Sequence, residues 1–113
     1  MDQKDEMFRL GWGADYPDPQ SFLEMLFHTG AADNFGEYSN PEVDALLDSA
    51  AVERQSETRM QLYSEAEQLI VSDAACLPLF FDVSYTLVKP YVENLPLTPF
   101  WIPRLRYASV QPH

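Results

Sequence analysis

The sequence is poor in cysteine and in basic residues. Among its 113 residues there is one cysteine, and 7 lysines and arginines stand against 18 aspartates and glutamates, which gives a formal net charge of -11. A single cysteine cannot form a disulfide within the chain, and Cys76 lies in the apolar run CLPLFF, where a free cysteine usually packs as a small hydrophobic residue. Nucleic-acid binding needs clustered lysine and arginine to neutralise phosphates. The composition therefore argues against nucleic-acid binding and against a reactive thiol.

Long apolar runs are absent as well. No stretch reaches the roughly 20 apolar residues that a membrane-spanning helix needs, and the first residues, MDQKDEMF, are charged and contain no apolar core of a secretion signal. We therefore expect a chain that is soluble as given, does not span a membrane and has no signal peptide of its own. Because 46% of the residues are hydrophobic and 13% aromatic, there is enough apolar material for one domain.

The motifs of common enzymes and metal sites are missing too. The sequence contains no P-loop, no G-x-S-x-G, no H-E-x-x-H and no paired C-x-x-C. His28 lies at a loop edge and His113 at the chain end, so no histidine-based triad or zinc site can assemble, and the acidic stretches fall short of the calcium-loop pattern. We expect no enzyme, no metal and no cofactor. A hydrolase that uses acidic residues is a further hypothesis, but the sequence offers no arrangement of nucleophile and base to support it.

The first segment with a clear pattern, residues 8–15, alternates with a period of two and predicts a half-buried strand. Glycine inside a strand often marks the close approach of a ligand or of another backbone, although a bulge or tight packing explains it equally well. One face of the segment carries Phe8, Leu10, Trp12 and Ala14, and the other carries Arg9, Gly11, Gly13 and Asp15.

Three helices should follow this strand. Asp18 before Pro19, and Asn40 before Pro41, both match the pattern of a capping residue followed by proline at the first helical position, and Ser56 can cap the third helix. The second and third helices should form a hairpin. The expected apolar stripes are Phe22, Leu23, Leu26 and Phe27; then Val43, Leu46, Leu47, Ala50 and Ala51; then Leu62, Tyr63, Ala66, Leu69 and Ile70.

The C-terminal part returns to strand-like alternation. Residues 76–88 predict a long strand or hairpin that pairs with, or lies near, the first strand. Prolines then interrupt the chain, and Phe100, Trp101 and Ile102 form an apolar group that would mark a partner surface or a missing piece of protein if left uncovered. The expected fold class is α+β, with about three helices packed on a small mixed sheet.

Five segments follow one another in order over nearly the whole chain: GWGADYPDPQSFL, YSNPEVDALLDSA, RMQLYSEAEQLI, LPLFFDVSYTLVKPYVENL and RLRYASV. Together they resemble the C-terminal stretch of the extracytoplasmic solute-binding proteins of oligopeptide and dipeptide ABC transporters. The resemblance implies part of a periplasmic-binding-protein-like fold, whose two lobes close over a peptide. It assigns residues 1–90 to one lobe and residues 91–113 to a tail returning toward the other lobe. It also implies a periplasmic parent that works with an ABC permease.

The resemblance further implies which residues bind the ligand. Asp15 would bind the α-ammonium of a peptide or other amine-bearing ligand, and the segment from Gly11 to Gly13 would pair with the ligand backbone. Arg9 matches a position where some oligopeptide binders carry an arginine for the peptide carboxylate, and Trp12 either lines the cleft or packs in the core. The chemistry is suitable, because a carboxylate forms a charge-assisted hydrogen bond worth about 1.5–3 kcal/mol with an ammonium group. The other lobe normally completes the site, so this chain alone should bind peptides weakly or not at all.

A second hypothesis comes from a different class. The chain could be a small free-standing interaction module with no small-molecule ligand, in which Asp15 only terminates a strand. In either case, strand edges that lack neighbours, or the C-terminal tail, favour a homodimer.

Overall fold

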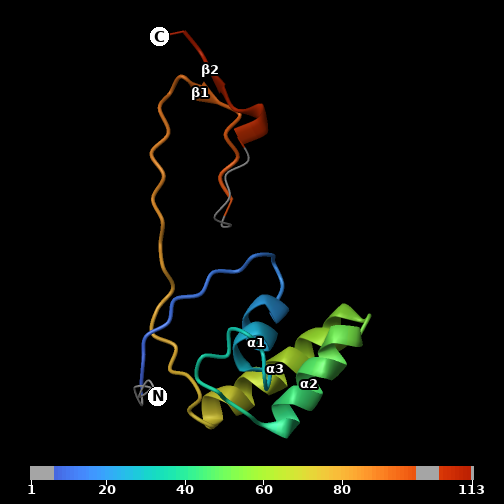
Figure 1. Cartoon of the computed structure of the whole chain (residues 1–113). Coiled ribbons are helices and arrows are strands. Elements are labelled where there is room, and N and C mark those ends of the chain that lie inside the picture. Colours follow the sequence, from blue (N-terminus) through green and yellow to red (C-terminus); the bar gives the residue numbers. More distant parts are fainter. Residues whose placement is uncertain (1–6, 99–104, 113) are drawn as a thin grey trace.

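The computed structural model describes residues 7–98 and 105–112. Within them the chain forms one cluster of three helices, from which the C-terminal part extends away (Figure 1). The radius of gyration over Cα atoms is 18.7 Å, whereas a compact domain of this length would have about 13 Å. The elements are α1 (Gln20–Phe27), α2 (Pro41–Val52), α3 (Ser56–Ser72), β1 (Val92–Glu93), a 3-10 turn (Leu105–Tyr107) and β2 (Ser109–Val110).

Short-range signals set the helix starts. Asn40 caps α2 by accepting a hydrogen bond from the Glu42 amide at 2.9 Å, with Pro41 at the first position, which confirms the prediction. The Asp18 carboxylate accepts from the Gln20 amide at 2.9 Å, although the helical hydrogen-bond pattern of α1 begins only at Gln20. The predicted cap at Ser56 is wrong, because Ser56 is the first residue of α3.

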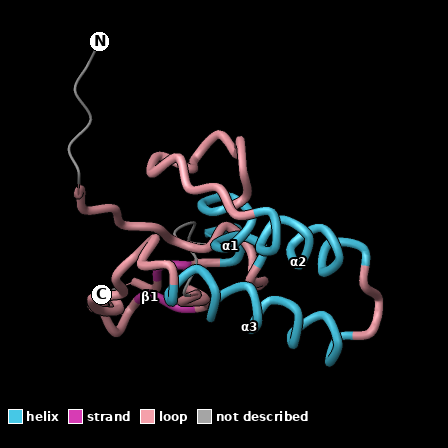
Figure 2. Tube along the Cα trace, turned by 90° about the horizontal axis from the view of Figure 1, so that it is seen from below, coloured by secondary structure: helices cyan, strands magenta, loops and turns pink. Residues whose placement is uncertain are grey.

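The core lies where α2 and α3 run side by side as a hairpin, with α1 against them (Figure 2). The predicted stripes supply all of its fully buried apolar members: Val43, Leu47, Ala50, Tyr63, Ala66 and Ile70. The helical spacing of three and four residues explains this agreement. Two predicted stripe positions are exposed, Ala51 and Phe22, because each lies at the margin of its helix face rather than at the helix contact.

The two long predicted strands do not form. Residues 8–14 and 76–88 have no strand structure, and Arg9 and Phe80 mark the place where the two segments approach each other. The alternating pattern alone cannot make a strand, because a strand needs a neighbour to pair its backbone groups.

The small sheet also differs from the expectation. It is an antiparallel pair, in which Val92 faces Val110 and Glu93 faces Ser109. Among the described elements no helix contacts either strand, so helices packed on a mixed sheet are not what the chain forms. The α+β class is confirmed, and the two-lobe fold stays a prediction.

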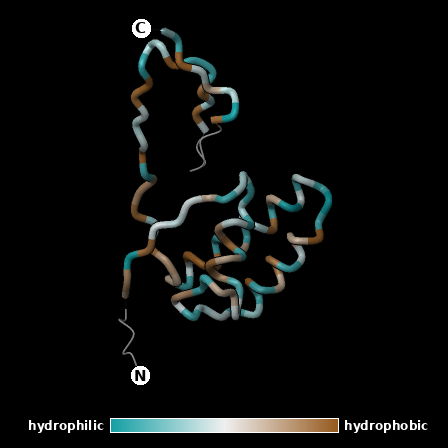
Figure 3. The backbone as a smooth tube through the Cα atoms, turned by 45° about the horizontal axis from the view of Figure 1, so that its top comes forward, coloured by the Kyte–Doolittle hydropathy of each residue, from teal (hydrophilic) through white to brown (hydrophobic). Residues whose placement is uncertain are grey.

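Uncovered apolar side chains are the main consequence of the missing pairing. Figure 3 shows hydrophobic and polar residues alternating along the segment that leads from the helices toward the C-terminus. Phe81 is 97% exposed and Leu87 99% exposed, which is far from the environment these side chains favour. The predicted patch of Phe100, Trp101 and Ile102 lies outside the described residues.

The helices of the described ranges are all too short or too polar to cross a bilayer.

Candidate ligand-binding segment

Ser21 organises the segment that contains the predicted ligand residues. It lies in the first turn of α1 and is fully buried. Its backbone carbonyl accepts a hydrogen bond from the Trp12 indole Nε1 at 2.6 Å, and its Oγ accepts one from the Asp15 amide at 3.1 Å. Trp12 and Asp15 are therefore both held against the start of α1.

The Asp15 carboxylate is exposed and has no hydrogen bond or ion pair with the part of the chain that the structure describes. The backbone of Asp15 is fixed while its charge faces solvent. A charge in this position can pair with a cation from outside the chain, because nothing within the described residues neutralises it.

Trp12 is half-buried, with its indole N–H used by α1. Trp12 is not among the side chains packed against the helical core, and its role as a cleft wall stays a prediction. Gly11 has open space around it: a Cβ at this position would meet no described atom within 4 Å, and its φ lies outside the left-handed region. Packing against the described residues therefore does not explain the glycine.

Arg9 does not join Asp15. Its guanidinium lies over the ring of Phe80, 5.4 Å from the centroid, which is a cation–π contact on an exposed surface. The structure thus brings Trp12 and Asp15 together through Ser21, whereas the Arg9 side chain packs against Phe80 of the other extended segment.

Arg59 connects this segment to the helical core. Its Nη1 and Nη2 donate to the two Asp18 carboxylate oxygens at 2.5 and 2.8 Å, its Nε donates to the Ala50 carbonyl at 3.1 Å, and Nη2 also donates to the Tyr63 hydroxyl at 3.0 Å. The hydrogen bonds from Arg59 are the main reason that the pKa of Asp18 lies below its usual range. The start of α1 is therefore anchored to both α2 and α3.

Beside the segment there is an open, mostly apolar hollow. Its lining includes Phe8, Leu10 and Trp12, apolar side chains of α1, and the segment around Phe80. The volume is about 3300 Å³, well above the roughly 300–1,000 Å³ of a formed small-molecule pocket. The described residues alone therefore do not enclose a ligand.

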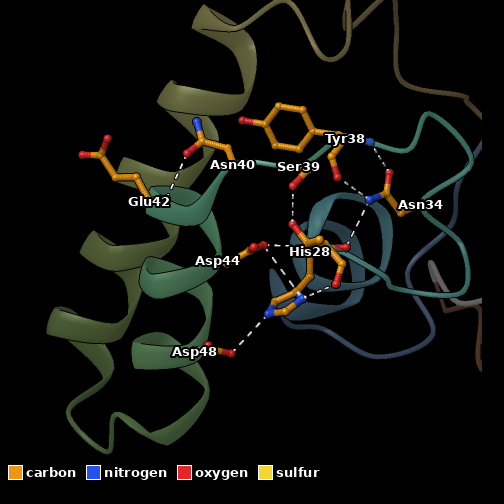
Figure 4. A network of polar contacts seen from close by, with 9 residues as sticks. His28, Asn34, Tyr38, Ser39, Asn40, Glu42, Asp44 and Asp48 are labelled. Atoms are coloured by element: carbon orange, nitrogen blue, oxygen red, sulfur yellow. Dashed lines mark hydrogen bonds and ion pairs between the residues drawn. The ribbon is translucent and has the colours of Figure 1, made fainter.

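A second polar cluster closes the loop between α1 and α2 (Figure 4). His28 Nδ1 lies 3.0 Å from the Thr29 carbonyl and Nε2 lies 3.2 Å from Asp48, while Asp44 accepts from the Thr29 amide at 2.9 Å. The Thr29 carbonyl contributes most to raising the pKa of His28, followed on the same side by Asp48 and Asp44, against the effect of burial. The imidazolium form therefore fits this site best.

The same loop is fastened from inside by Asn34, which is 9% exposed. Its side-chain amide donates to the carbonyls of His28 and Tyr38, and its oxygen accepts from the Tyr38 amide. Tyr38 and Asn40 in turn donate to Asp73 at 2.6 and 2.8 Å, and burial raises the pKa of Tyr38 to about 12. These polar groups form hydrogen bonds with one another, so the cluster stabilises the loop and has a structural role.

No group of three or more histidine, cysteine, aspartate or glutamate side chains in residues 7–98 and 105–112 is arranged to hold a metal ion. Burial raises the pKa of the Cys76 thiol, which packs against the helical core. This agrees with a packing role for Cys76.

Sequence reasoning missed two residues of the candidate site, Ser21 and Arg59. A serine in the first turn of a helix is common, and no pattern reveals that its hydroxyl accepts from an amide six residues earlier. Arg59 stands four residues before Tyr63 on one face of α3, which is the only local signal, while its partner Asp18 is 41 residues away.

Comparison with known proteins identifies binding proteins as relatives. The chain is 34% identical over 87 residues to the periplasmic oligopeptide-binding protein OppA of Salmonella typhimurium, which covers 77% of the chain and 16% of the relative. It is 36% identical over 89 residues to the probable deoxycholate-binding periplasmic protein YgiS of Escherichia coli, covering 79% and 16%. It is 33% identical over 111 residues to the dipeptide-binding protein DppE of Bacillus subtilis, covering 96% and 20%. No family model matches the sequence.

Over this part, the chain is related to periplasmic oligopeptide- and dipeptide-binding proteins, and it spans about a sixth to a fifth of the length of these relatives. The resemblance stated from the five sequence segments is thereby confirmed. The relatives are named as binding or transport proteins and not as enzymes.

Proposed function

We propose that this chain is the C-terminal part of the peptide-binding component of an ABC importer, and that Asp15 receives the α-ammonium of the bound peptide. Residues 1–90 would form part of one lobe and residues 91–113 a tail toward the other. The parent protein would act in the periplasm and deliver its ligand to the permease. Relatives named for oligopeptide and dipeptide binding support the ligand class.

One observation carries the role of Asp15: its carboxylate is exposed and unpaired among the described residues while its backbone amide is held by buried Ser21. A charged side chain that is not neutralised and whose backbone is already held can bind a cation with little further ordering of the chain. A peptide ammonium supplies three donors and one positive charge, which matches a carboxylate.

The open space at Gly11 supports a ligand that lies along the segment. Because no described atom crowds this position, the glycine is best explained by an approaching backbone from outside. Gly13 lies on the same face, two residues on. Main-chain pairing along this face would bind peptides of many sequences, because it does not depend on the ligand's side chains.

Trp12 and Arg9 take supporting roles in this proposal. Trp12 would contribute the wall that faces the ligand at the start of α1. Arg9 would turn from the Phe80 ring to the ligand carboxylate when a peptide of suitable length is bound, since cation–π contacts at exposed sites are worth only about 0.5–1 kcal/mol.

The relative named as a probable deoxycholate-binding protein raises a different ligand chemistry. Deoxycholate is an anion at neutral pH and has no amine. The Asp15 carboxylate would repel it, so an amine-bearing ligand is the better match for this chain.

The experiment is calorimetry with short peptides on the complete binding protein of which we propose this chain to be part. Asp15→Asn should weaken binding about 10- to 150-fold, the equivalent of about 1.5–3 kcal/mol for a hydrogen bond to a charged group. Glu65→Gln removes one negative charge from an exposed site on α3 and serves as the control, with unchanged affinity expected. Equal affinity of Asp15→Asn and wild type would remove the proposed role.

A second candidate function is favoured by the uncovered apolar side chains of residues 77–87: a free-standing interaction module with no small-molecule ligand. This candidate predicts that no peptide binds in any context and that Asp15→Asn changes nothing. The same calorimetry therefore separates the two.

A further inference from the structure

We infer that Ser21 is the positioning residue of the ammonium site: it holds the segment from Trp12 to Asp15 so that the Asp15 carboxylate meets the ligand amine. This inference rests on the proposed function of Asp15. It adds a residue that does not touch the ligand and that acts through the backbone of the residue that does.

The Ser21 hydroxyl is not occupied in capping α1. The carboxylate of Asp18 already accepts from the Gln20 amide at 2.9 Å, which is the usual work of a capping side chain. The Ser21 Oγ instead accepts from the amide of Asp15, which precedes the helix. Its hydroxyl therefore serves the segment and not the helix end.

Ser21 holds the segment at two points. The Trp12 indole N–H donates to the Ser21 carbonyl and the Asp15 N–H donates to the Ser21 hydroxyl. Two bonds to one fully buried residue fix both the distance and the direction of the chain between Trp12 and Asp15. Hydrogen bonds to a buried residue are exchanged for water only at a cost, so this arrangement persists.

Ser21 is itself anchored to the helical core. Asp18, three residues before it, forms the two-bond ion pair with Arg59, and Arg59 also bonds the Ala50 carbonyl and the Tyr63 hydroxyl in the helical core. The position of Asp15 is thus defined relative to α2 and α3, and not only relative to α1.

The consequence is a specific effect on ligand choice. If the backbone of Asp15 loses its bond to Ser21, the carboxylate must be ordered by the ligand, and ordering one residue costs about 1–2 kcal/mol, or about five- to thirtyfold in affinity. That loss falls on ligands with a free amine. Ligands without the amine gain nothing from Asp15 and lose nothing.

The test measures, in the complete binding protein, the affinity for a tripeptide with a free amine and for the same tripeptide N-acetylated. Their ratio is the readout. In Ser21→Ala the ratio should fall about five- to thirtyfold, and in Ser21→Thr, which keeps a hydroxyl, it should return toward the wild-type value. Leu47→Ala, a core change that only destabilises the fold, lowers the competent fraction for both peptides and should leave the ratio unchanged.

A second measurement uses this chain itself. Amide hydrogen exchange by NMR should show the Asp15 N–H less protected in Ser21→Ala than in wild type, with the amides of α3 unchanged. A Ser21→Ala protein that keeps the wild-type affinity ratio overturns the inference, whatever the protection of the Asp15 amide. If wild type binds the two peptides equally, the role of Asp15 is overturned. If wild type prefers the free amine and Ser21→Ala has the same affinity ratio, only the role of Ser21 is overturned.

Discussion

At the scale of single residues, Ala74 is the clearest case of a backbone conformation that its side chain does not favour. It follows α3 with φ of 55°, in the left-handed region, and its neighbour Ala75 donates to the Ile70 carbonyl at 3.1 Å in the pattern of a Schellman-type helix end. Glycine is the usual residue at this place, because it has no Cβ to strain.

Ala74→Gly should therefore raise the free energy of unfolding by about 0.5–1 kcal/mol, measured by urea denaturation followed by circular dichroism. Ala75→Gly is the matched control, because Ala75 has no positive φ and gains no relief. If both variants changed stability equally, strain at Ala74 would not be the cause.

At the scale of elements, the ion pair of Asp18 and Arg59 joins α1 to the hairpin. Both side chains are about a quarter exposed, at 26% and 23%, so solvent screens the pair only in part. Arg59→Met should lower the free energy of unfolding by about 1.5–3 kcal/mol, because Asp18, Ala50 and Tyr63 all lose a donor. Arg59→Lys keeps the charge but not the two-bond geometry, so it should restore only part of the loss in the same urea measurement.

The same pair gives an acid dependence. The pKa of Asp18 is lowered in the folded chain, chiefly by hydrogen bonds from Arg59, so its contribution is fully present above the unfolded value of about 3.9 and is lost as the pH falls through the folded pKa. Wild type should lose stability below about pH 4 more steeply than Asp18→Asn. Parallel curves for the two proteins would show that Asp18 does not carry this dependence.

His28 gives the opposite dependence in the loop between α1 and α2. Its folded pKa is raised above 6.5, first by the Thr29 carbonyl, so its contribution is present below pH 6.5 and is lost as the pH rises through the folded value. In wild type the free energy of unfolding should be higher at pH 6 than at pH 8.5, by up to about 1 kcal/mol. The difference should shrink in His28→Gln, and a difference that persists there would assign it to another group.

The sequence predicts the elements that local chemistry determines. Asn40 with Pro41 and the spacing of Val43, Leu47 and Ala50 are enough for α2, because capping and helix periodicity act within a few residues. Long-range partners cannot be obtained this way. The hydrogen bond between Asp15 and Ser21 and the ion pair between Asp18 and Arg59 depend on how the chain turns. The strand predicted near Phe80 does not form, because it needs a neighbouring strand that the alternating pattern does not supply.

At the scale of the whole molecule, the extended segment of residues 77–87 is the surface most in need of a partner. Within the described part of the chain the backbone of this segment forms no hydrogen bond, and its apolar side chains are exposed. Both features favour strand addition between two copies of this chain, even against a net charge of -11. Size-exclusion chromatography with light scattering should give a mass that rises toward the dimer with concentration and with salt, which screens the repulsion.

A matched pair of variants locates that surface. Val83 is 71% exposed on the extended segment and Val52 is 78% exposed at the end of α2. Val83→Lys should reduce the dimer, whereas Val52→Lys, the same chemical change at similar exposure, should not. A monomer at every concentration, or equal effects of the two variants, would remove the proposed strand addition.

The most direct measurement of the central claim is the affinity of the complete binding protein for one peptide with a free amine and for its N-acetylated form, in wild type and in Asp15→Asn. If Asp15 receives the ammonium, wild type prefers the free amine by about tenfold or more, and Asp15→Asn binds the two forms nearly equally. An undiminished preference for the free amine in Asp15→Asn would contradict the account, because another group would then bind the ligand's charge.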